Sequence, residues 1–480
     1  MTGFVELAAT AAYVLILLLL FPFGLHRLYL LWLRFRRDPG HEDDTWTAEL
    51  PPVTVQLPVY NEANVVERAI DAACRLDYPS DRLEVQVLDD SDDETSELAA
   101  RRVAAWRERG VDVRHLQRES REGYKAGALA HGVERASGDF FLILDADFVP
   151  EPELIRRLLP AFDDPEVGLV QGAWSHLNED DGGWLTRAQA VLLDAHFAVE
   201  HEARCRSGLF FNFNGTAGMW RRECLRDAGG WEGDTLTEDL DLSYRAQLRG
   251  WKGVYRDDVR VAGELPASVR SLEVQQERWA QGGVQTARKL LPAIWRSGES
   301  PAVKMEATSH LLSHLAHPLT TALGVALAAA GFLGGVQGLP DWFHALALSL
   351  AVLPFVLFYG VAAWLRGARP AVGLRKVAEA MTLGIGLGVP LSGAVARGAV
   401  DAGEDTPFRR TPKIGSGLLR QYSVSLRPVR TLLRLVLGLL LLVATARHLA
   451  AGAPAAVPFT LLFAAGYLST AVSSLRGAAS

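Results

Sequence analysis

The apolar residues of this 480-residue chain are gathered into separate long stretches, and this distribution constrains the fold more than any other feature. One stretch covers 4–25, where Glu6 is the one charged residue, and the others follow about residue 305. A helix of about 20 apolar residues is long enough to cross a bilayer. The later stretches are 311–335, 343–365, 377–396, 431–446 and 455–474. Residues 50–300 are charged and mixed, so the sequence predicts a soluble domain inserted between membrane segments.

The basic residues beside these stretches predict the orientation of the chain. Four arginines follow the first stretch, within residues 27–37, whereas no basic segment precedes it and no clear cleavage site ends it, so we interpret it as an anchor and not a signal peptide. Basic residues favour the cytoplasmic side, which places the N-terminus outside and 38–300 in the cytoplasm. Basic groups also flank 377–396, which is rich in glycine and contains Pro390. We expect this stretch to lie in the interface or to re-enter, leaving five spans in a cell inner or plasma membrane.

Charge and cysteine content narrow the choice of partners. The net charge of −7 argues against nucleic acid as the main partner. Cys74, Cys205 and Cys224 lie far apart without a CxxC pair, so they suggest neither a disulfide framework nor a zinc site. A reduced compartment fits this pattern, and the sequence does not indicate which protein partners the chain has.

Strand-like and helix-like segments alternate in the first part of the soluble domain. The expected strands are 53–60, 83–90, 112–118 and 139–147, and the expected helices are 61–74, a segment ending near 109, and 123–136. Such βαβ alternation predicts a mainly parallel, doubly wound sheet. The fourth strand is so apolar that we expect it to be buried on both faces.

Two of these strands end in acidic residues, namely Asp89 and Asp90 in the second and Asp145 and Asp147 in the fourth. Ligands of open α/β sheets bind beyond the carboxyl ends of the strands, so the two groups can share one cleft. In an extended segment, Asp-x-Asp spacing directs both carboxylates to the same side. Such a pair of oxygen ligands suits Mg²⁺ or Mn²⁺ carrying a diphosphate. The alternative for either group is an acidic turn that caps a helix.

Lys125 and Gly127 open the helix expected at 123–136. The amides at a helix N-terminus, together with a lysine, form a natural phosphate site. The alternative is an ordinary surface lysine beside a glycine.

Three carboxylates are crowded into four positions of "LTEDLDLSYR" (236–245), at Glu238, Asp239 and Asp241. One interpretation is a helix start that Thr237 caps, with acids at the positive end of the helix dipole. The other is a catalytic base. The two are compatible, because the dipole would also help to keep Asp239 ionised.

The order of these residues resembles a known enzyme family. Asp90, the Asp145–Asp147 pair, "TED" (237–239) and "QQERW" (275–279) are similar to the D, DxD, TED, QxxRW series of family 2 processive glycosyltransferases, the cellulose synthase superfamily. Segments such as "GYKAGAL", "FNFNGTAGMWR" and "AGGW" look especially like the cellulose-synthase-like A group, the plant glucomannan and mannan synthases. The chain lacks plant-type insertions and a cyclic-dinucleotide domain. The resemblance, which extends into the membrane segments, implies a Rossmann-like α/β GT-A domain.

The resemblance implies a role for each matching residue. Asp239, within the Thr237–Glu238–Asp239 motif, matches the base that takes the proton of the acceptor hydroxyl. Asp147 matches the main metal ligand, with Asp145 toward the nucleotide. The expected nucleotide-sugar contacts are Asp89, Asp90, Lys125, Asp145 and Arg278. The expected acceptor contacts are Gln275, Trp279, Asn214 and Gly215, for which core packing of Trp279 and an ordinary tight loop at 211–218 are the alternatives.

A basic segment, "PFRRTPK" (407–413), precedes the 431–446 stretch. It resembles the FxVTxK gating loop of the family, with Phe408, Thr411 and Lys413 matching and Arg410 in place of valine. The alternative is a juxtamembrane loop that binds anionic lipid. We therefore divide the chain into an N-terminal membrane helix (1–37), a cytoplasmic GT-A domain (38–300) and a membrane region with a gating-type loop (301–480).

These features lead to three functional hypotheses. The first is an inverting polymerase that adds β-linked hexoses to a polysaccharide and passes it through the bilayer, making β-1,4-mannan or glucomannan from GDP-mannose, or a glucan from UDP-glucose. The second is a glycolipid synthase, such as a UDP-glucose-dependent lipid glucosyltransferase, which would need no channel. The third is a transporter or scaffold with a degenerate transferase domain, and the intact Asp147 and Asp239 argue against it.

Overall fold

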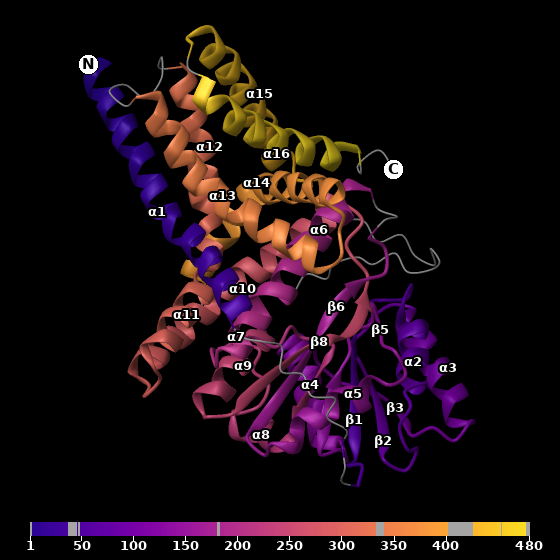
Figure 1. The fold of residues 1–480 in the computed structure, drawn as a ribbon. Coiled ribbons are helices and arrows are strands. Elements are labelled where there is room, and N and C mark those ends of the chain that lie inside the picture. Colours follow the sequence, from indigo (N-terminus) through magenta and orange to yellow (C-terminus); the bar gives the residue numbers. More distant parts are fainter. Residues whose placement is uncertain are drawn as a thin grey trace.

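The computed structural model describes residues 2–36, 46, 49–179, 183–332, 340–401, 426–452 and 454–476. These residues form an α/β domain on which a group of long helices sits (Figure 1). Helix α1 (Thr2–Arg36) runs along the side of this group and its C-terminal end reaches the α/β domain, where Arg34 Nε donates to the Ala198 carbonyl at 2.9 Å. The predicted gating segment, 407–413, lies outside the described residues.

Eight strands form one mixed sheet in the order β3-β2-β1-β4-β7-β6-β8-β5. The four predicted strands are parallel neighbours: β1 (Val53–Val59), β2 (Leu83–Asp89), β3 (Val113–Gln117) and β4 (Phe140–Ile143). The others are β5 (Phe148–Val149), β6 (Val167–His176), β7 (Gly218–Arg221) and β8 (Lys252–Gly263). Strand β7 runs antiparallel to β4 and β6, and β5 runs antiparallel to β8. The prediction of a mainly parallel Rossmann-like sheet is confirmed.

Helices cover both faces of the sheet, as a doubly wound fold requires. On one face, α2 (Val66–Cys74), α3 (Thr95–Arg107) and α5 (Leu154–Leu158) pack against the valines of β1 and β2. On the other face lie α4 (Tyr124–Arg135), α8 (Arg222–Asp227) and α9 (Glu238–Leu248). Because β1 is buried on both faces, even its polar positions are internal, and Gln56 Nε2 donates to Gln86 Oε1 at 3.1 Å.

The fourth strand is shorter than predicted. It ends at Ile143, and the chain then turns, with the Phe148 N–H donating to the Asp145 carbonyl at 3.0 Å. The turn is needed because β5 begins at Phe148 and pairs antiparallel with β8. Asp145 and Asp147 therefore lie on a turn and not on the extended segment that we expected.

The chain between β6 and the membrane helices connects the two regions. Helix α6 (Trp184–Ala195), a π-helical turn, η2 (His196–His201), and α7 (Glu202–Arg206) precede β7. Helix α10 (Val269–Arg296) follows β8 and begins at Ser268, whose hydroxyl accepts from the Ser271 N–H at 3.1 Å. It carries the "QQERW" segment, and α11 (Pro301–Leu311) follows it.

Six helices of the described chain are long and apolar enough to cross a membrane. They are α1, α12 (Ala316–Phe332), α13 (Asp341–Leu365), α14 (Pro370–Val400), α15 (Pro428–Ala450) and α16 (Val457–Arg476). Every apolar stretch singled out in the sequence thus forms such a helix. Helix α14 is the most buried of the six and lies between α16 and the pair α6 and α10 (Figure 1).

Candidate active site

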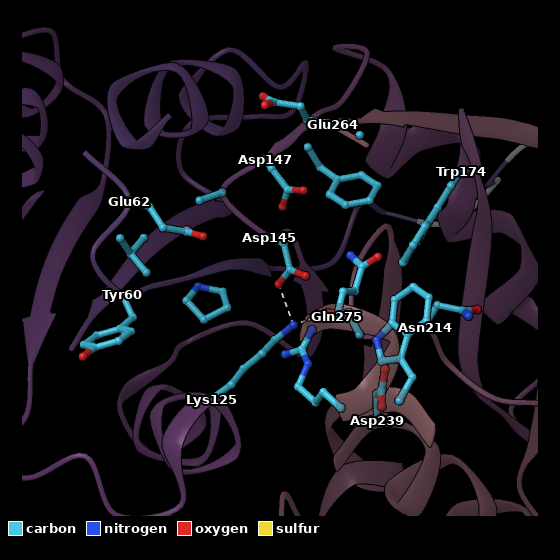
Figure 2. Close-up of a pocket in the computed structure, with 18 of the residues that line it drawn as sticks. Tyr60, Glu62, Lys125, Asp145, Asp147, Trp174, Asn214, Asp239, Glu264 and Gln275 are labelled. Carbon is cyan, nitrogen blue, oxygen red and sulfur yellow. Dashed lines mark hydrogen bonds and ion pairs between the residues drawn. The ribbon is translucent and has the colours of Figure 1, made fainter. Parts of the chain in front are cut away.

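A cleft lies at the carboxyl ends of β1, β2 and β4, where the acidic strand ends meet α9 and α10. All predicted site residues except Asp89 line it: Asp90, Lys125, Asp145, Asp147, Asn214, Gly215, Thr237, Glu238, Asp239, Gln275, Arg278 and Trp279. Figure 2 shows the two aspartates of the turn in the middle of this cleft, with Tyr60 and Glu62 on one side and Trp174 and Asn214 on the other. Segments nearly 200 residues apart in sequence therefore form one site.

Lys125 is the cation closest to the acidic turn. Its Nζ contacts Asp145 Oδ1 at 2.5 Å and the Gly215 carbonyl at 2.9 Å (Figure 2). Burial alone would lower the pKa of Lys125, but the Asp145 and Glu238 carboxylates outweigh it and hold the pKa above its ordinary value. The lysine is therefore charged and points at the place where Asp145 and Asp147 converge.

Asp239 lies at the start of α9, on the side of the cleft opposite Asp147 (Figure 2). Its Oδ1 accepts the Leu240 N–H at 2.8 Å. Burial, followed by the charge of Glu238, raises the pKa of Asp239 from 3.8 to about 7. Gly215 has a φ of +78°, and a Cβ there would come within 2.9 Å of Asp239 Oδ2, so only glycine leaves this carboxylate open to the cleft. A half-buried carboxylate that is open to a cleft and has a pKa near neutral is suited to general base catalysis.

Thr237 occupies the cap position of α9 but does not cap it with its side chain. Its hydroxyl instead lies 3.1 Å from that of Thr286 on α10. The reason is the close approach of α10, since a Cβ at Gly282 would lie 2.7 Å from Thr237 Cγ2. The expected side-chain cap is therefore wrong, and Thr237 joins the helix that carries "QQERW" to the one that carries Asp239.

The raised pKa of Asp239 predicts an acidic limb in the pH profile. A base works in its ionised form, so kcat/KM should fall as the pH drops through about 7, by about tenfold per pH unit below the pKa. Glu238→Gln removes a charge that raises this pKa, so the limb should move to lower pH. Steady-state rates across the neutral range test both expectations. A limb that does not move in the Gln variant would assign it to another group.

The two acids at the end of β2 have different environments. Asp90 lines the cleft and receives a two-point ion pair from Arg118, at 2.5 and 3.0 Å. Asp89 is buried behind it, where His115 Nε2 lies 2.8 Å from Oδ2 and the Ser91 N–H donates to Oδ1 at 2.9 Å. Burial would raise the pKa of Asp89, but these hydrogen bonds outweigh it and keep the pKa low. The structure thus brings Asp90, and not Asp89, into the cleft.

Helix α10 supplies the far wall of the cleft through Gln275, Arg278 and Trp279. Asn214 also lines the cleft, but Figure 2 shows its side-chain amide pointing away from the two aspartates. That amide lies 2.9 Å from His196 Nε2. The Asn214 side chain therefore links the loop at 211–218 to the π-helical turn η2.

Several lining residues escaped the sequence analysis, among them Tyr60, Arg121, Trp174, His176 and Glu264. Trp174 and His176 close β6 at the same edge of the sheet as Asp145, so the strand-end rule that found the acids could have found them. The Arg121 guanidinium lies over the Tyr60 ring, 3.3 Å from its centroid, and no sequence spacing indicates this pair.

A second cluster of carboxylates contains a lysine that offsets part of its negative charge. Ligand oxygens of Glu232, Asp234 and Asp241 lie within 4.8 Å of one another, close enough to hold a metal ion. However, Lys289 Nζ contacts all three, at 2.6, 2.7 and 3.0 Å. The ammonium group takes the place of a cation, and it ties α10 to α9.

Comparison with known proteins agrees with this geometry. Residues 51–282, which contain the sheet and the "QQERW" segment, match the model of the glycosyltransferase-like family 2. The α/β domain is therefore similar to the family 2 glycosyltransferases over these residues.

The α/β domain is also similar to curated proteins. The chain is 43% identical over 270 residues to glucomannan 4-beta-mannosyltransferase 2 of Arabidopsis thaliana. The matched region covers 55% of this chain and 50% of the relative. It is 42% identical over 271 residues to glucomannan 4-beta-mannosyltransferase 1 of Oryza sativa subsp. japonica, with 55% and 52% covered. The chain thus spans about half the length of the curated relatives it matches. These relatives confirm the predicted resemblance to the cellulose-synthase-like A group.

Among solved structures, the chain is similar to the mannosyltransferase PcManGT of Pyrobaculum calidifontis, solved in complex with GDP-Man and Mn²⁺. The TM-score is 0.52 at 23% identity, and the match covers 79% of this chain and 99% of that one. This likeness confirms the GT-A fold of the α/β domain.

Proposed function

We propose that the chain is a membrane-embedded, inverting glycosyltransferase that builds β-1,4-linked mannan or glucomannan from GDP-mannose and passes the polymer through its membrane helices. The observation that carries the proposal is the position of Asp239, a half-buried carboxylate that lies across the cleft from Asp147, in a cleft that Trp279 also lines. The mannosyltransferase activity of the curated relatives supports mannose as the sugar. UDP-glucose is the alternative donor.

The chemistry assigned to Asp239 follows from its environment. In a single displacement with inversion, the acceptor hydroxyl must lose its proton as it attacks the anomeric carbon. Asp239 takes that proton, because its raised pKa makes the carboxylate a sufficient base near neutral pH. Lys125, which contacts Asp145, holds positive charge in the same cleft, where it can stabilise the leaving diphosphate. Such a displacement requires no covalent intermediate.

The acidic turn fits a divalent cation. Asp145 and Asp147 offer carboxylate oxygens, the ligands that Mg²⁺ and Mn²⁺ prefer, and both line the cleft. Asp147 is the proposed main ligand, and Asp145, which Lys125 contacts, is the proposed link to the nucleotide. A bound cation would neutralise charge on the leaving diphosphate. The neighbouring Glu232–Asp234–Asp241 group does not fit a metal, because Lys289 fills it.

The nucleotide is proposed to lie between Tyr60 and Lys125. Asp90 lines that end of the cleft and is fixed by Arg118, so it can accept a hydrogen bond from a base or ribose. Arg278 faces the cleft from α10 and suits a developing phosphate charge. Asp89 is not assigned a direct contact, because it lies behind Asp90.

The acceptor is proposed to bind at the α10 end. The Trp279 ring can stack on the apolar face of a pyranose, and Gln275 can hydrogen-bond the hydroxyls beside it. Gly215 contributes because its backbone approaches Asp239 closely. Asn214 contributes because its side chain holds the loop at 211–218 against His196. Trp174, whose indole N–H has no hydrogen-bond partner among the described residues, completes this end.

Helix α14 is proposed to lie along the membrane interface and not to span the bilayer. Near one end Glu379 pairs with Arg187 of α6, at 2.8 and 3.0 Å, and near the other end Arg397 pairs with Glu277 of α10, at 3.1 Å. The segment between these pairs is about 27 Å long. Its two ends could not both reach one cytoplasmic domain if it crossed a bilayer core of about 30 Å.

This arrangement supports five spans in a cell inner or plasma membrane, with the catalytic domain in the cytoplasm. Single cysteines placed at the two ends of α14 should be labelled from the same face of sealed vesicles. Labelling from opposite faces would contradict it.

The proposal of a processive polymerase predicts that Trp279→Ala shortens or abolishes the polymer. Loss of the stacking surface should release the acceptor between additions, and removal of a sugar-stacking ring typically costs on the order of 1–2 kcal/mol, or roughly tenfold in binding. Sizing of radiolabelled product at early times tests this. Wild-type protein should make long chains while most acceptors are untouched. An unchanged chain length in the variant would count against the stacking role, and a single glycolipid product would favour a glycolipid synthase.

A further inference from the structure

Glu277, in the middle of "QQERW", points away from the catalytic cleft and is held by three arginines. Arg397 at the end of α14 contacts its Oε2 at 3.1 Å. Arg427 contacts Oε1 at 2.5 Å, and Arg430 contacts the same oxygen. One carboxylate thus gathers three guanidinium groups at the junction of α10, α14 and α15.

These arginines have guanidinium N–H groups beyond those that bind Glu277 and Gln281. Arg427 and Arg430 each give one N–H to Glu277, and Arg397 gives a second to Gln281 at 3.1 Å. A guanidinium carries five N–H donors, and these three side chains are 24–44% exposed. Among the described residues, most of these N–H donors have no acceptor, so they are available to a ligand.

The charges around this point do not balance among the described residues. The neighbouring ion pair is Arg434 with Glu273, at 2.7 Å. Together with the residues around Glu277, four guanidinium groups face two carboxylates. The positive end of the α15 dipole adds to this surplus, because α15 begins at Pro428 with no acid in its first turn. An anion would restore the balance.

Exposed aliphatic side chains surround the same arginines. Val400 is 84% exposed at the end of α14, and Val429, Leu432 and Leu433 are 69%, 60% and 48% exposed on the first turns of α15. Large apolar side chains are normally found on a surface in such numbers where they meet another apolar phase. The arginines thus lie at the edge of an apolar surface. A phospholipid has the same arrangement, with a charged headgroup next to apolar acyl chains.

We propose that Arg397, Arg427 and Arg430 bind the phosphate of an anionic phospholipid, whose acyl chains lie against Val429, Leu432 and Leu433. Glu277 keeps the three guanidinium groups together when no phosphate is bound, and it competes with the phosphate for them. The proposal rests on the membrane placement of α15 and not on the sugar chemistry.

Native mass spectrometry of the delipidated full-length protein tests the site, titrated with phosphatidylglycerol or with phosphatidylcholine of the same acyl chains. Phosphatidylglycerol should bind at least about tenfold more tightly, given about 1 kcal/mol per basic residue at a lipid surface. The R427Q/R430Q variant should lose about tenfold or more of this preference. R375Q, which removes an exposed arginine near the other end of α14, is the matched control and should retain it.

Two further measurements keep the proposal falsifiable if R427Q/R430Q does not fold. Glu277→Gln removes the competing carboxylate, so phosphatidylglycerol should bind more tightly. Inorganic phosphate should not displace the lipid at matched concentration, because it lacks acyl chains. Equal binding of the two lipids, weaker binding in Glu277→Gln, or displacement by inorganic phosphate would each overturn the lipid site. Since the assay needs no nucleotide sugar, it can fail while the proposed enzyme activity stands.

Discussion

Replacing Asp239 with asparagine should lower the rate of sugar transfer by about 10²–10⁴ while the donor still binds. The amide keeps the size of the side chain and can still accept the Leu240 N–H, but it cannot take a proton from the acceptor. The nucleotide end of the cleft, around Asp90 and Lys125, is unchanged. Turnover of labelled nucleotide sugar and calorimetric binding of the nucleoside diphosphate measure the two effects separately.

Asp241→Asn is the matched control for Asp239. It is the same substitution two residues further along α9, at a carboxylate held by Arg245 at 2.7 Å and by Lys289 at 3.0 Å. Loss of these buried ion pairs should lower the thermal stability of the protein, whereas the folded fraction should keep its activity. Near-normal turnover in Asp239→Asn, or an equal loss in both variants, would remove Asp239 from the mechanism.

Removal of divalent metal should stop the reaction, and Asp147→Ala should weaken donor binding. The leaving diphosphate carries more negative charge than Lys125 and Arg278 can neutralise, and Asp147, which lines the cleft, is the proposed main ligand of a cation there. Activity should vanish in EDTA and return on addition of Mg²⁺ or Mn²⁺. Calorimetric titration of the nucleoside diphosphate, with and without metal, should show that Asp147→Ala abolishes the metal-dependent part of binding.

The control for metal dependence is Asp234→Asn. It removes one acid from the Glu232–Asp234–Asp241 group, where Lys289 already supplies the positive charge. The metal requirement should therefore be unchanged in this variant. Full activity of the wild-type protein in metal-free buffer would refute the role given to Asp147.

The sequence was sufficient to predict four of the eight strands and most of the cleft, because these features depend on local patterns. Alternation of apolar segments defined β1 to β4 within a few residues, and the strand-end rule placed Asp90, Asp145 and Asp147 together. The six membrane-length helices followed from hydropathy alone. Each of these features depends on residues that are close in the chain.

What the sequence analysis missed depends on partners far away in the chain. Asp89 turns out of the cleft because His115 of the next strand binds it. Thr237 does not cap α9, because α10 approaches it at Gly282, 45 residues later. Likewise, Lys289 fills the acidic group on α9. Contacts of this kind are fixed by tertiary packing, which a single sequence does not show.

The central claim is that the chain polymerises β-1,4-linked mannose, and the product made by the purified full-length protein from labelled GDP-mannose tests it most directly. We expect a long polymer that endo-β-1,4-mannanase cuts to short fragments, with UDP-glucose giving less product when supplied alone. A chloroform-soluble lipid bearing one labelled sugar, or a polymer that the mannanase leaves intact, would contradict the claim.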